Sequence, residues 1–317
     1  MDPLSDLLRV IHLDGAHFYT VEASAPWRVE TVAARELTPR IMPGAEHLIS
    51  YHIVAEGRCF GSAVGEEPVE LAAGDVIMFP QGDAHVMAST SEKPSGKAVK
   101  RDATPSYPFT VQLGKGRRAV SLVCGFLGCD RRPFNPLLAA LPRQLRFRGM
   151  SSGWLGAFVR HVNDESLRGR PGADSVLTRL SELMFIEALR RYLDDLPAGQ
   201  TGWLAGLRDE VVGQALTHLH GRPAHHWTLD ELARESSTSR TILAKRFTAL
   251  VGQAPMQYLT QWRMQLAADL LAKGSAKVSA IGDQVGYDSE AAFSRAFKKA
   301  TGESPGAWRE THRSGAK

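Results

Sequence analysis

The sequence has few cysteines and no long apolar run, and both shortages narrow the classes of protein that it can form. Its 317 residues include three scattered cysteines, Cys59, Cys124 and Cys129, an odd number that completes no common zinc motif. Such a cysteine content fits a reducing cytoplasm. No apolar stretch approaches the roughly 18 residues of a membrane span, and the acidic start Met1–Asp6 is unlike an export signal. We therefore expect a cytoplasmic protein.

A strong excess of either charge is also missing. The chain carries 38 Lys+Arg against 34 Asp+Glu, and residues 203–317, with 15 basic and 11 acidic side chains, hold the whole net charge of +4. Four charges over such a length are weak evidence for nucleic acid, because solvated basic faces are commoner than DNA-binding ones. The hydrophobic fraction of 43% excludes wholesale disorder and collagen. The length predicts about two domains of roughly 150 residues each.

The first 130 residues favour β structure. Short runs rich in branched and aromatic residues, such as 49–54 and 76–79, are separated by glycines. Strands this closely spaced predict an antiparallel sandwich or barrel rather than strands that alternate with helices. Residues 89–107 are polar and predict a surface loop, and Val120–Phe126 predicts a returning strand.

A helical period replaces this pattern from about Pro136. Between Asp174 and Leu196, apolar residues recur at helical spacing and form a broad stripe. That stripe could pack inside the chain or against a second copy of it, so an intramolecular core helix and a homodimer both remain open. The breaker-rich segment Pro197–Gly202 predicts a linker after this helix.

The last third of the chain contains an internal repeat. At an offset of 50 residues the segment matches itself in the pairs Ser239 and Ser289, Leu243 and Phe293, Lys245 and Arg295, Phe247 and Phe297, Gly252 and Gly302, Pro255 and Pro305, and Tyr258 and Trp308. Each copy predicts a short helix (229–234 and 278–284), a tight turn and a second helix (about 239–250 and 289–301). Because apolar residues four apart share one helix face, each second helix has a side that must be buried.

A short helix, a turn and a second helix with one apolar and one polar face are typical of a helix-turn-helix. The second helix of such a unit fits the major groove, where Arg and Lys read guanine. One copy alone would be weak evidence, since helix pairs in ordinary cores look similar, but two copies are much stronger. Between them, residues 255–271 predict a rigid helix of about 25 Å, which could set the second helices on successive major-groove faces about 34 Å apart.

These segments resemble the AraC/XylS family of bacterial transcription regulators. The resemblance covers about residues 207–309, and its motifs are Trp227–Ala233, Ser239-Arg240, Arg246-Phe247, Tyr258–Met264, Val285–Phe297, Gly302 and Ser304-Pro305. It implies that two helix-turn-helix units bind direct repeats in promoter DNA, with activation of transcription by RNA polymerase.

The resemblance also implies roles for individual residues. The base-reading positions are Thr241, Ala244, Lys245, Glu290, Ser294 and Arg295, and the same polar faces carry Arg240 and Ala291. Lys298 and Lys299 are expected to contact phosphates, which position a protein without specifying sequence. The first turn departs from the family because it has Ser236-Ser237-Thr238 where a glycine is usual, whereas the second turn keeps Gly286. A serine with positive φ costs of order 1 kcal/mol, so the first motif could be reshaped.

The β-rich part resembles the cupin-type ligand-binding domain of one branch of this family. Gly74-Asp75, Phe79-Pro80, Gly82 and His85 follow the second cupin motif, and Tyr51-His52 with Glu56-Gly57 resembles part of the first. Cupin enzymes hold a metal through two histidines one residue apart, but Val54 stands where the second would be. His52 and His85 could still join Cys124 or Cys59 in a zinc site. The alternative is that His85 caps a turn and Cys124 is a small buried hydrophobe.

These observations combine into one hypothesis. The fold class is α+β: a cupin-like antiparallel β-barrel at 1–134, a helical dimerisation segment and linker at 135–202, and an all-α double helix-turn-helix domain at 203–317. The function is sequence-specific DNA binding by an effector-responsive activator without a cofactor, and His52, His85 and Cys124 are the candidate effector contacts. A metal-dependent cupin enzyme with a DNA-binding tail is the alternative, and a constitutive architectural binder is a third possibility. The clustered histidines His218, His220, His225 and His226 are expected to be exposed or hydrogen-bonded at a helix end.

Overall fold

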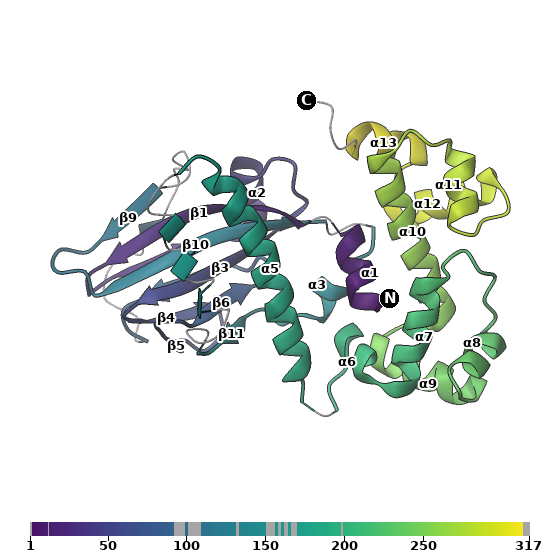
Figure 1. Cartoon of the computed structure of the whole chain (residues 1–317), viewed down its shortest axis with the longest axis horizontal. Helices are drawn as coiled ribbons and strands as arrows, with labels where there is room; N and C mark the ends of the chain where they lie inside the picture. Colours follow the sequence, from purple (N-terminus) through teal and green to yellow (C-terminus); the bar gives the residue numbers. More distant parts are fainter. Residues whose placement is uncertain are drawn as a thin grey trace. The chain divides into compact units, whose positions relative to one another are not determined.

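The computed structural model describes residues 2–11, 13–91, 99–100, 109–130, 133–149, 156–157, 160–161, 164–165, 170–197 and 199–312. Its contacts divide the chain into two compact units (Figure 1). The β unit comprises Leu13–Asp130 and Leu141–Tyr192, and the helical unit comprises Met1–His12, Arg131–Ala140 and Leu193–Lys317. Each unit is therefore assembled from segments that lie far apart in the sequence.

Two sheets make up the β unit. The larger, six-stranded sheet has the order β11 (Leu145–Phe147), β6 (Val76–Phe79), β3 (His47–Glu56), β10 (Val120–Cys129), β1 (Leu13–Ala23) and β9 (Phe109–Leu113). The five-stranded sheet has the order β5 (Val69–Ala72), β4 (Arg58–Ala63), β7 (His85–Ala88), β2 (Arg28–Thr31) and β8 (Val99–Lys100). The predicted strand at Val120–Phe126 is the first part of β10.

The expected α+β class is confirmed, but the described strands form two sheets rather than one closed antiparallel barrel. A barrel closes only when every edge strand finds a partner, and β11 and β9 are the edges of the larger sheet within the described residues. Two of the pairs, β1 with β9 and β2 with β8, are parallel. Most of the expected surface loop at 89–107, namely 92–98 and 101–108, lies outside the described residues.

The central strands β3 and β10 are buried along almost their whole length. Between the sheets, Val54 and Leu122 of the larger sheet share one apolar cluster with Leu71 of the smaller. On the opposite face, α2 (Ala34–Ile41) packs over Leu48 and Phe126. Because both faces are covered, these strands show continuous burial instead of the alternation of a half-exposed strand.

The long helix α5 (Ala173–Asp194) crosses a face of the six-stranded sheet (Figure 1), as the apolar stripe at 174–196 predicted for a core helix. Leu177, Met184 and Leu189 are buried. The hydroxyl of Tyr51 on β3 lies 2.8 Å from that of Ser181. The stripe is wider than this contact, so Leu183 keeps 46% of its surface exposed.

The helical unit consists of short helices around one long one. Its helices are α1 (Pro3–Val10), α3 (Pro136–Ala140), α6 (Trp203–Arg208), α7 (Glu210–Gly221), α8 (Leu229–Glu235), α9 (Arg240–Val251), α10 (Pro255–Lys273), α11 (Val278–Gln284), α12 (Glu290–Thr301) and α13 (Pro305–His312). Helix α10 contacts α9 on one side and α11, α12 and α13 on the other. No helix within the described ranges combines the length and the apolar character needed to cross a membrane.

This division differs from the expected domain boundaries, because residues 1–12 and part of the 135–202 segment belong to the helical unit. Leu7 and Ile11 of the α1 segment are buried, α1 packs on α7 and α10, and α3 packs on α6. The physical reason is that α1 is strongly amphipathic, with Leu4, Leu7 and Val10 on one side. An amphipathic pattern predicts a buried face but does not identify the core that receives it.

The offset-50 repeat is visible in the packing of the helical unit. In the first copy the ring of Phe247 meets that of Tyr258 edge to face, with centroids 5.7 Å apart. In the second copy Phe297 meets Trp308 edge to face at 5.8 Å. Matching ring pairs in matching places indicate two copies of one supersecondary unit.

Candidate nucleic-acid interface and effector site

The second helix of each motif, α9 and α12, begins and ends in the same way. The Ser239 hydroxyl accepts the Ile242 N–H at 3.3 Å, and the Ser289 hydroxyl accepts the Ala292 N–H at 3.3 Å. Such caps satisfy N–H groups that have no partner inside the helix. Both helices end at a glycine with left-handed backbone, Gly252 or Gly302. Each helix is thus fixed at both ends by residues that match across the repeat.

The two faces of these helices are sharply different. Leu243 and Phe247 of α9 and Phe293 and Phe297 of α12 have no exposed surface. The opposite faces hold the residues predicted to contact DNA: Arg240, Thr241, Lys245, Glu290, Ala291, Arg295, Lys298 and Lys299 are exposed, and Ala244 and Ser294 are partly buried. These side chains are therefore accessible to a partner, and their contact with DNA remains a prediction.

The turns before these helices carry the expected difference. Ser237 has a φ of 53°, and it is the non-glycine residue with positive φ in the described chain, while Gly286 has a φ of 84°. The missing glycine is therefore at Ser237. The offset between the copies is 49 from Leu229 of α8 to Val278 of α11 but 50 from Arg240 to Glu290, so the second turn has one extra residue before its cap.

At Gly286 a side chain would also have no room, since an added Cβ would lie 2.5 Å from the carbonyl oxygen of Ala224. Close by, Arg263 of α10 donates to the carbonyl oxygens of Pro223 at 2.7 Å, His225 at 2.9 Å and Gly286 at 3.2 Å. The guanidinium of Arg263 thus joins the segment that precedes α8 to the turn that precedes α12. Sequence reasoning quoted Arg263 within a motif but did not assign it this positioning role.

Two ion pairs join α9 to its neighbouring helices. Arg240 pairs with Asp230 of α8 at 3.1 Å, and Arg246 pairs with Asp209 at the start of α7. Asp209 also caps α7 by accepting the N–H groups of Val211 and Val212. Arg240 is therefore turned toward its own motif, and Lys245 is the cation on the free face of α9.

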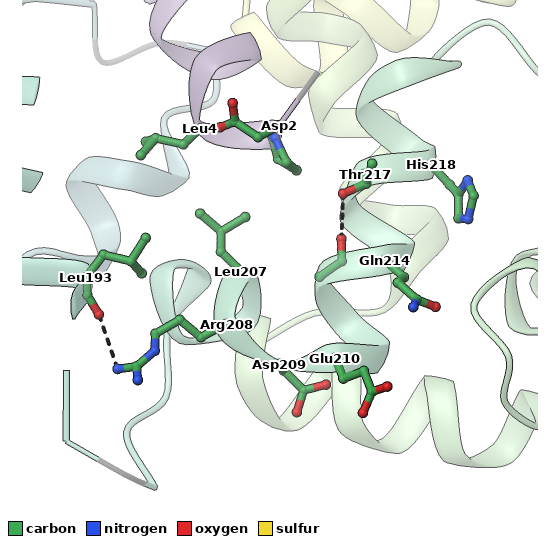
Figure 2. Close-up of a pocket in the computed structure, with 12 residues that line it drawn as sticks. Asp2, Leu4, Leu193, Leu207, Arg208, Asp209, Glu210, Gln214, Thr217 and His218 are labelled. Carbon is green, nitrogen blue, oxygen red and sulfur yellow. Dashed lines mark hydrogen bonds between the residues drawn. The ribbon is translucent and has the colours of Figure 1, made fainter. Parts of the chain in front are cut away.

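A cavity of about 630 Å³ lies in the helical unit between α1, α6 and α7 (Figure 2). Leu4, Leu193 and Leu207 line its apolar part. At its edge Arg208 donates to the carbonyl oxygens of Leu193 at 3.2 Å and Leu196 at 2.8 Å, and Figure 2 shows the first of these bonds. Arg208 thus joins α6 to the end of α5 and the segment after it. The predicted effector contacts do not line this cavity, because they lie in the β unit.

In the β unit the structure brings together His52, His85 and Cys124, which the sequence proposed as one cluster. His52 and Cys124 face each other across the β3–β10 pair, with Nδ1 and Sγ 2.9 Å apart. The Nε2 atoms of His52 and His85 are 2.8 Å apart, and His85 Nδ1 lies 3.1 Å from the carbonyl oxygen of Asp83. All three side chains are buried, and the ring of Phe79 stacks on His85 with centroids 4.0 Å apart.

These contacts determine which ring nitrogens of His52 and His85 carry a hydrogen. The Asp83 carbonyl can only accept, so His85 Nδ1 carries a hydrogen and its Nε2 accepts one from His52 Nε2. His52 Nδ1 then accepts from the Cys124 thiol. Burial keeps both rings neutral, because it lowers the pKa of His85 to about 4 and, with the neighbouring His85, lowers the pKa of His52 well below its ordinary value.

This line of hydrogen bonds does not fit a zinc ion. His52 lies in the middle and uses one ring nitrogen toward Cys124 and the other toward His85, so the three donors do not converge on a point. Within the residues that the structure describes, no group of three or more His, Cys, Asp or Glu is arranged to hold a metal. Burial raises the pKa of Cys59 to about 12, which disfavours a metal-binding thiolate there.

Of the clustered histidines of the helical unit, His218, His220 and His225 are hydrogen-bonded, and His226 is exposed near Asp288. His218 lies 3.1 Å from the Glu235 carbonyl oxygen, and His225 pairs with Glu231 at 2.9 Å. His220 is buried and lies 2.7 Å from the Tyr258 hydroxyl. These rings connect helices and form no separate site.

Comparison with known proteins finds a family match for each part of the chain. A cupin family model matches residues 2–194, and a helix-turn-helix domain model matches residues 232–311. The chain is 35% identical over 315 residues to a protein named as an AraC-like transcription regulator of Streptomyces antibioticus, covering 98% of this chain and 99% of that one. A similarly named protein of Streptomyces lividans is 33% identical over 319 residues, with 98% of both chains covered.

The HTH-type transcriptional regulator AlkR of Acinetobacter baylyi is 28% identical over 320 residues, covering 98% of this chain and 99% of AlkR. These relatives are named as regulators of transcription, so the alternative of a cupin enzyme with a DNA-binding tail is not favoured. With a cupin domain followed by a helix-turn-helix domain and relatives matched along the whole length, the chain belongs to the AraC-like family of DNA-binding transcription regulators.

Proposed function

We propose that this regulator is an effector-responsive activator that reads two adjacent major-groove segments with α9 and α12. The observation that carries the proposal is the matched pair of second helices, each with two fully buried apolar residues and an exposed polar face. They are joined by α10, whose 19 residues span about 28 Å. Half-sites one helical turn apart, about 34 Å, lie within reach of helices held in this way.

Individual roles follow from the chemistry of the exposed faces. Lys245 and Arg295 occupy matching positions and can each donate to a guanine. The remaining proposed base contacts are Thr241, Ala244, Glu290 and Ser294, and Arg240 and Ala291 lie beside them on the same proposed DNA-binding faces. Lys298 and Lys299 are proposed to bind phosphates, and α9 has Thr248 and Ala249 at these positions, so the two helices place their basic residues differently.

The β unit is proposed to bind a small-molecule effector, and His52, His85 and Cys124 are its candidate contacts. All three are buried, and each is already hydrogen-bonded to the next. An effector that forms a hydrogen bond with the residue at one end would therefore change the hydrogen bonds of the other two. Such a molecule shifts the equilibrium between two arrangements of the regulator only if it binds them unequally.

A homodimer and contact with RNA polymerase complete the proposal. The exposed apolar residues Val176 and Leu183 of α5, 38% and 46% exposed, support a second copy of the chain as the partner of this helix. Burying them against an identical helix would remove apolar surface from water. Sedimentation of the wild-type chain and of Leu183→Glu tests this part, and a monomeric wild type would refute it.

In vitro selection of DNA by the full chain tests the DNA-binding proposal. The wild type is expected to select a bipartite site. Arg295→Ala should lose about 1–3 kcal/mol of binding free energy and relax the preference at one base pair, whereas Lys298→Ala should weaken all sequences alike and reduce the salt dependence. Unchanged base preferences in Arg295→Ala would refute the assignment of the α12 face. Binding that no metabolite alters would favour a constitutive architectural binder.

A further inference from the structure

One residue on the free face of α9 is not accounted for by the roles above. Ile242 has 49% of its surface exposed, and it belongs to the few large hydrophobic residues exposed in the described chain. It lies three residues after the cap Ser239, in the first turn of the helix. Its β-branched side chain is no aid to helix formation, and it is not in the core. Neither helix propensity nor packing therefore explains an isoleucine at this position.

The direction of Ile242 follows from helix geometry. Residues three or four apart lie on the same side of a helix, so Ile242 and Thr241 both neighbour Lys245. At about 100° per residue, Leu243 and Phe247 point to the core and these three residues point away from it. Arg240, by contrast, is engaged by Asp230. The free surface at the start of α9 thus has one cation, one hydroxyl and one branched apolar group.

Only one feature of the major groove is complementary to such an apolar group. Base edges and phosphates there are polar, except for the C5-methyl group of thymine. The first residues of a second helix are those that reach base edges. We infer that Ile242 packs against a thymine methyl and makes that thymine a requirement of the half-site read by α9. The inference rests on the proposed function, because it needs α9 in the major groove.

The second motif provides the internal contrast. Ala292 is the residue of α12 that corresponds to Ile242, and it is partly buried. A methyl side chain there cannot reach as far as a sec-butyl group. The α12 half-site therefore has no thymine requirement from this position, and the two half-sites differ in sequence although the motifs share one plan.

Deoxyuridine in place of thymine tests the inference, because it removes the methyl group and leaves the base pair intact. The DNA tested is the sequence that the full chain selects in vitro. The half-site read by α9 is identified as the half whose base preference changes in Lys245→Ala. At one thymine of that half, deoxyuridine should weaken the wild type about three- to five-fold, the effect expected for one buried methyl group. Ile242→Ala should bind the thymine site with a similar loss and lose nothing more with deoxyuridine, and Ile242→Val should retain part of the methyl effect.

Several outcomes would overturn the inference. An α9 half-site without a fixed thymine would do so, as would wild-type affinity that deoxyuridine leaves unchanged, or an undiminished deoxyuridine effect in Ile242→Ala. In these cases specific DNA binding persists. If the full chain selects no DNA sequence at all, the proposed function fails and the inference falls with it. Unaltered thermal unfolding of Ile242→Ala, expected for an exposed side chain, shows that the variant is folded.

Discussion

At the turn of the first motif, a serine holds the backbone conformation that a glycine holds in the second. Ser237 has a φ of 53° and its N–H bonds to the Arg234 carbonyl oxygen at 3.1 Å, while Gly286 bonds in the same way to Asp283 at 3.0 Å. The turn is thus formed without glycine, at the cost of crowding between the serine Cβ and the backbone. The first motif is strained at this residue but not rearranged.

Replacing this serine should stabilise the helical unit. Ser237→Gly is expected to raise the free energy of unfolding by up to about 1 kcal/mol, because relief of the left-handed strain exceeds the added freedom of the unfolded chain. The matched control is Ser236→Gly, since Ser236 has a φ of −96° and gains nothing from glycine. Chemical denaturation compares the three proteins, and a Ser237→Gly protein less stable than wild type would contradict the account.

The buried histidines make a second prediction at this scale. Below pH 6.5, His52 and His85 bind protons in the unfolded chain but stay neutral in the folded one, because burial lowers the pKa of both. Lowering the pH therefore favours the unfolded state, by about 1.4 kcal/mol per pH unit for each such histidine. For His85 this loss begins near pH 6.5 and continues to its folded pKa of about 4.

Denaturant unfolding between pH 7 and pH 5 measures this effect. Burial lowers the pKa of His220 to about 3, so the helical unit contributes in the same direction. His85→Gln is the control, and its stability should depend less steeply on pH. A free energy of unfolding that stays constant over this range would show that the chain of histidines is not neutral and buried.

Among the elements, α1 shows most clearly that position in the sequence does not determine the unit to which a segment belongs. Leu7 has no exposed surface, and α1 packs on α7 and α10 although more than a hundred residues separate them. Asp2 caps the helix by accepting the Ser5 N–H at 2.9 Å. A segment that precedes the first strand is therefore part of the core of the DNA-binding unit.

Leu7→Ala should accordingly destabilise the helical unit. Loss of a fully buried leucine typically costs 2–5 kcal/mol, and the loss should appear as faster amide hydrogen exchange in α7 and α10. Arg9→Ala should change exchange less than Leu7→Ala, because the Arg9 side chain is exposed and its loss removes no buried apolar group, although its partner Asp6 is buried. Faster exchange in β3 and β10 with α7 and α10 unchanged would place α1 with the β unit instead.

At the scale of the whole molecule, the sequence predicted those parts in which burial requires apolar residues at regular spacing. Leu243 with Phe247 and Phe293 with Phe297 had to be buried, and that requirement indicated both helix-turn-helix motifs. Sheet closure depends on the pairing of edge strands, which no local pattern specifies, so the fold class was confirmed but the described strands form two sheets where a barrel was expected. Likewise, the sequence suggested that His52, His85 and Cys124 are close together. Only the contacts of the ring nitrogens show that they form a line of hydrogen bonds instead of a metal site.

The central claim is that one rigid helical unit presents two second helices to one stretch of DNA. The measurement that tests it most directly is the affinity of the full chain for its selected site as the half-site spacing is changed. Lengthening the spacing by half a turn or by a full turn, about five or ten base pairs, should each weaken binding by a factor on the order of 100, because α10 fixes the separation. Affinity that returns at a full turn, or that ignores spacing, would contradict the claim.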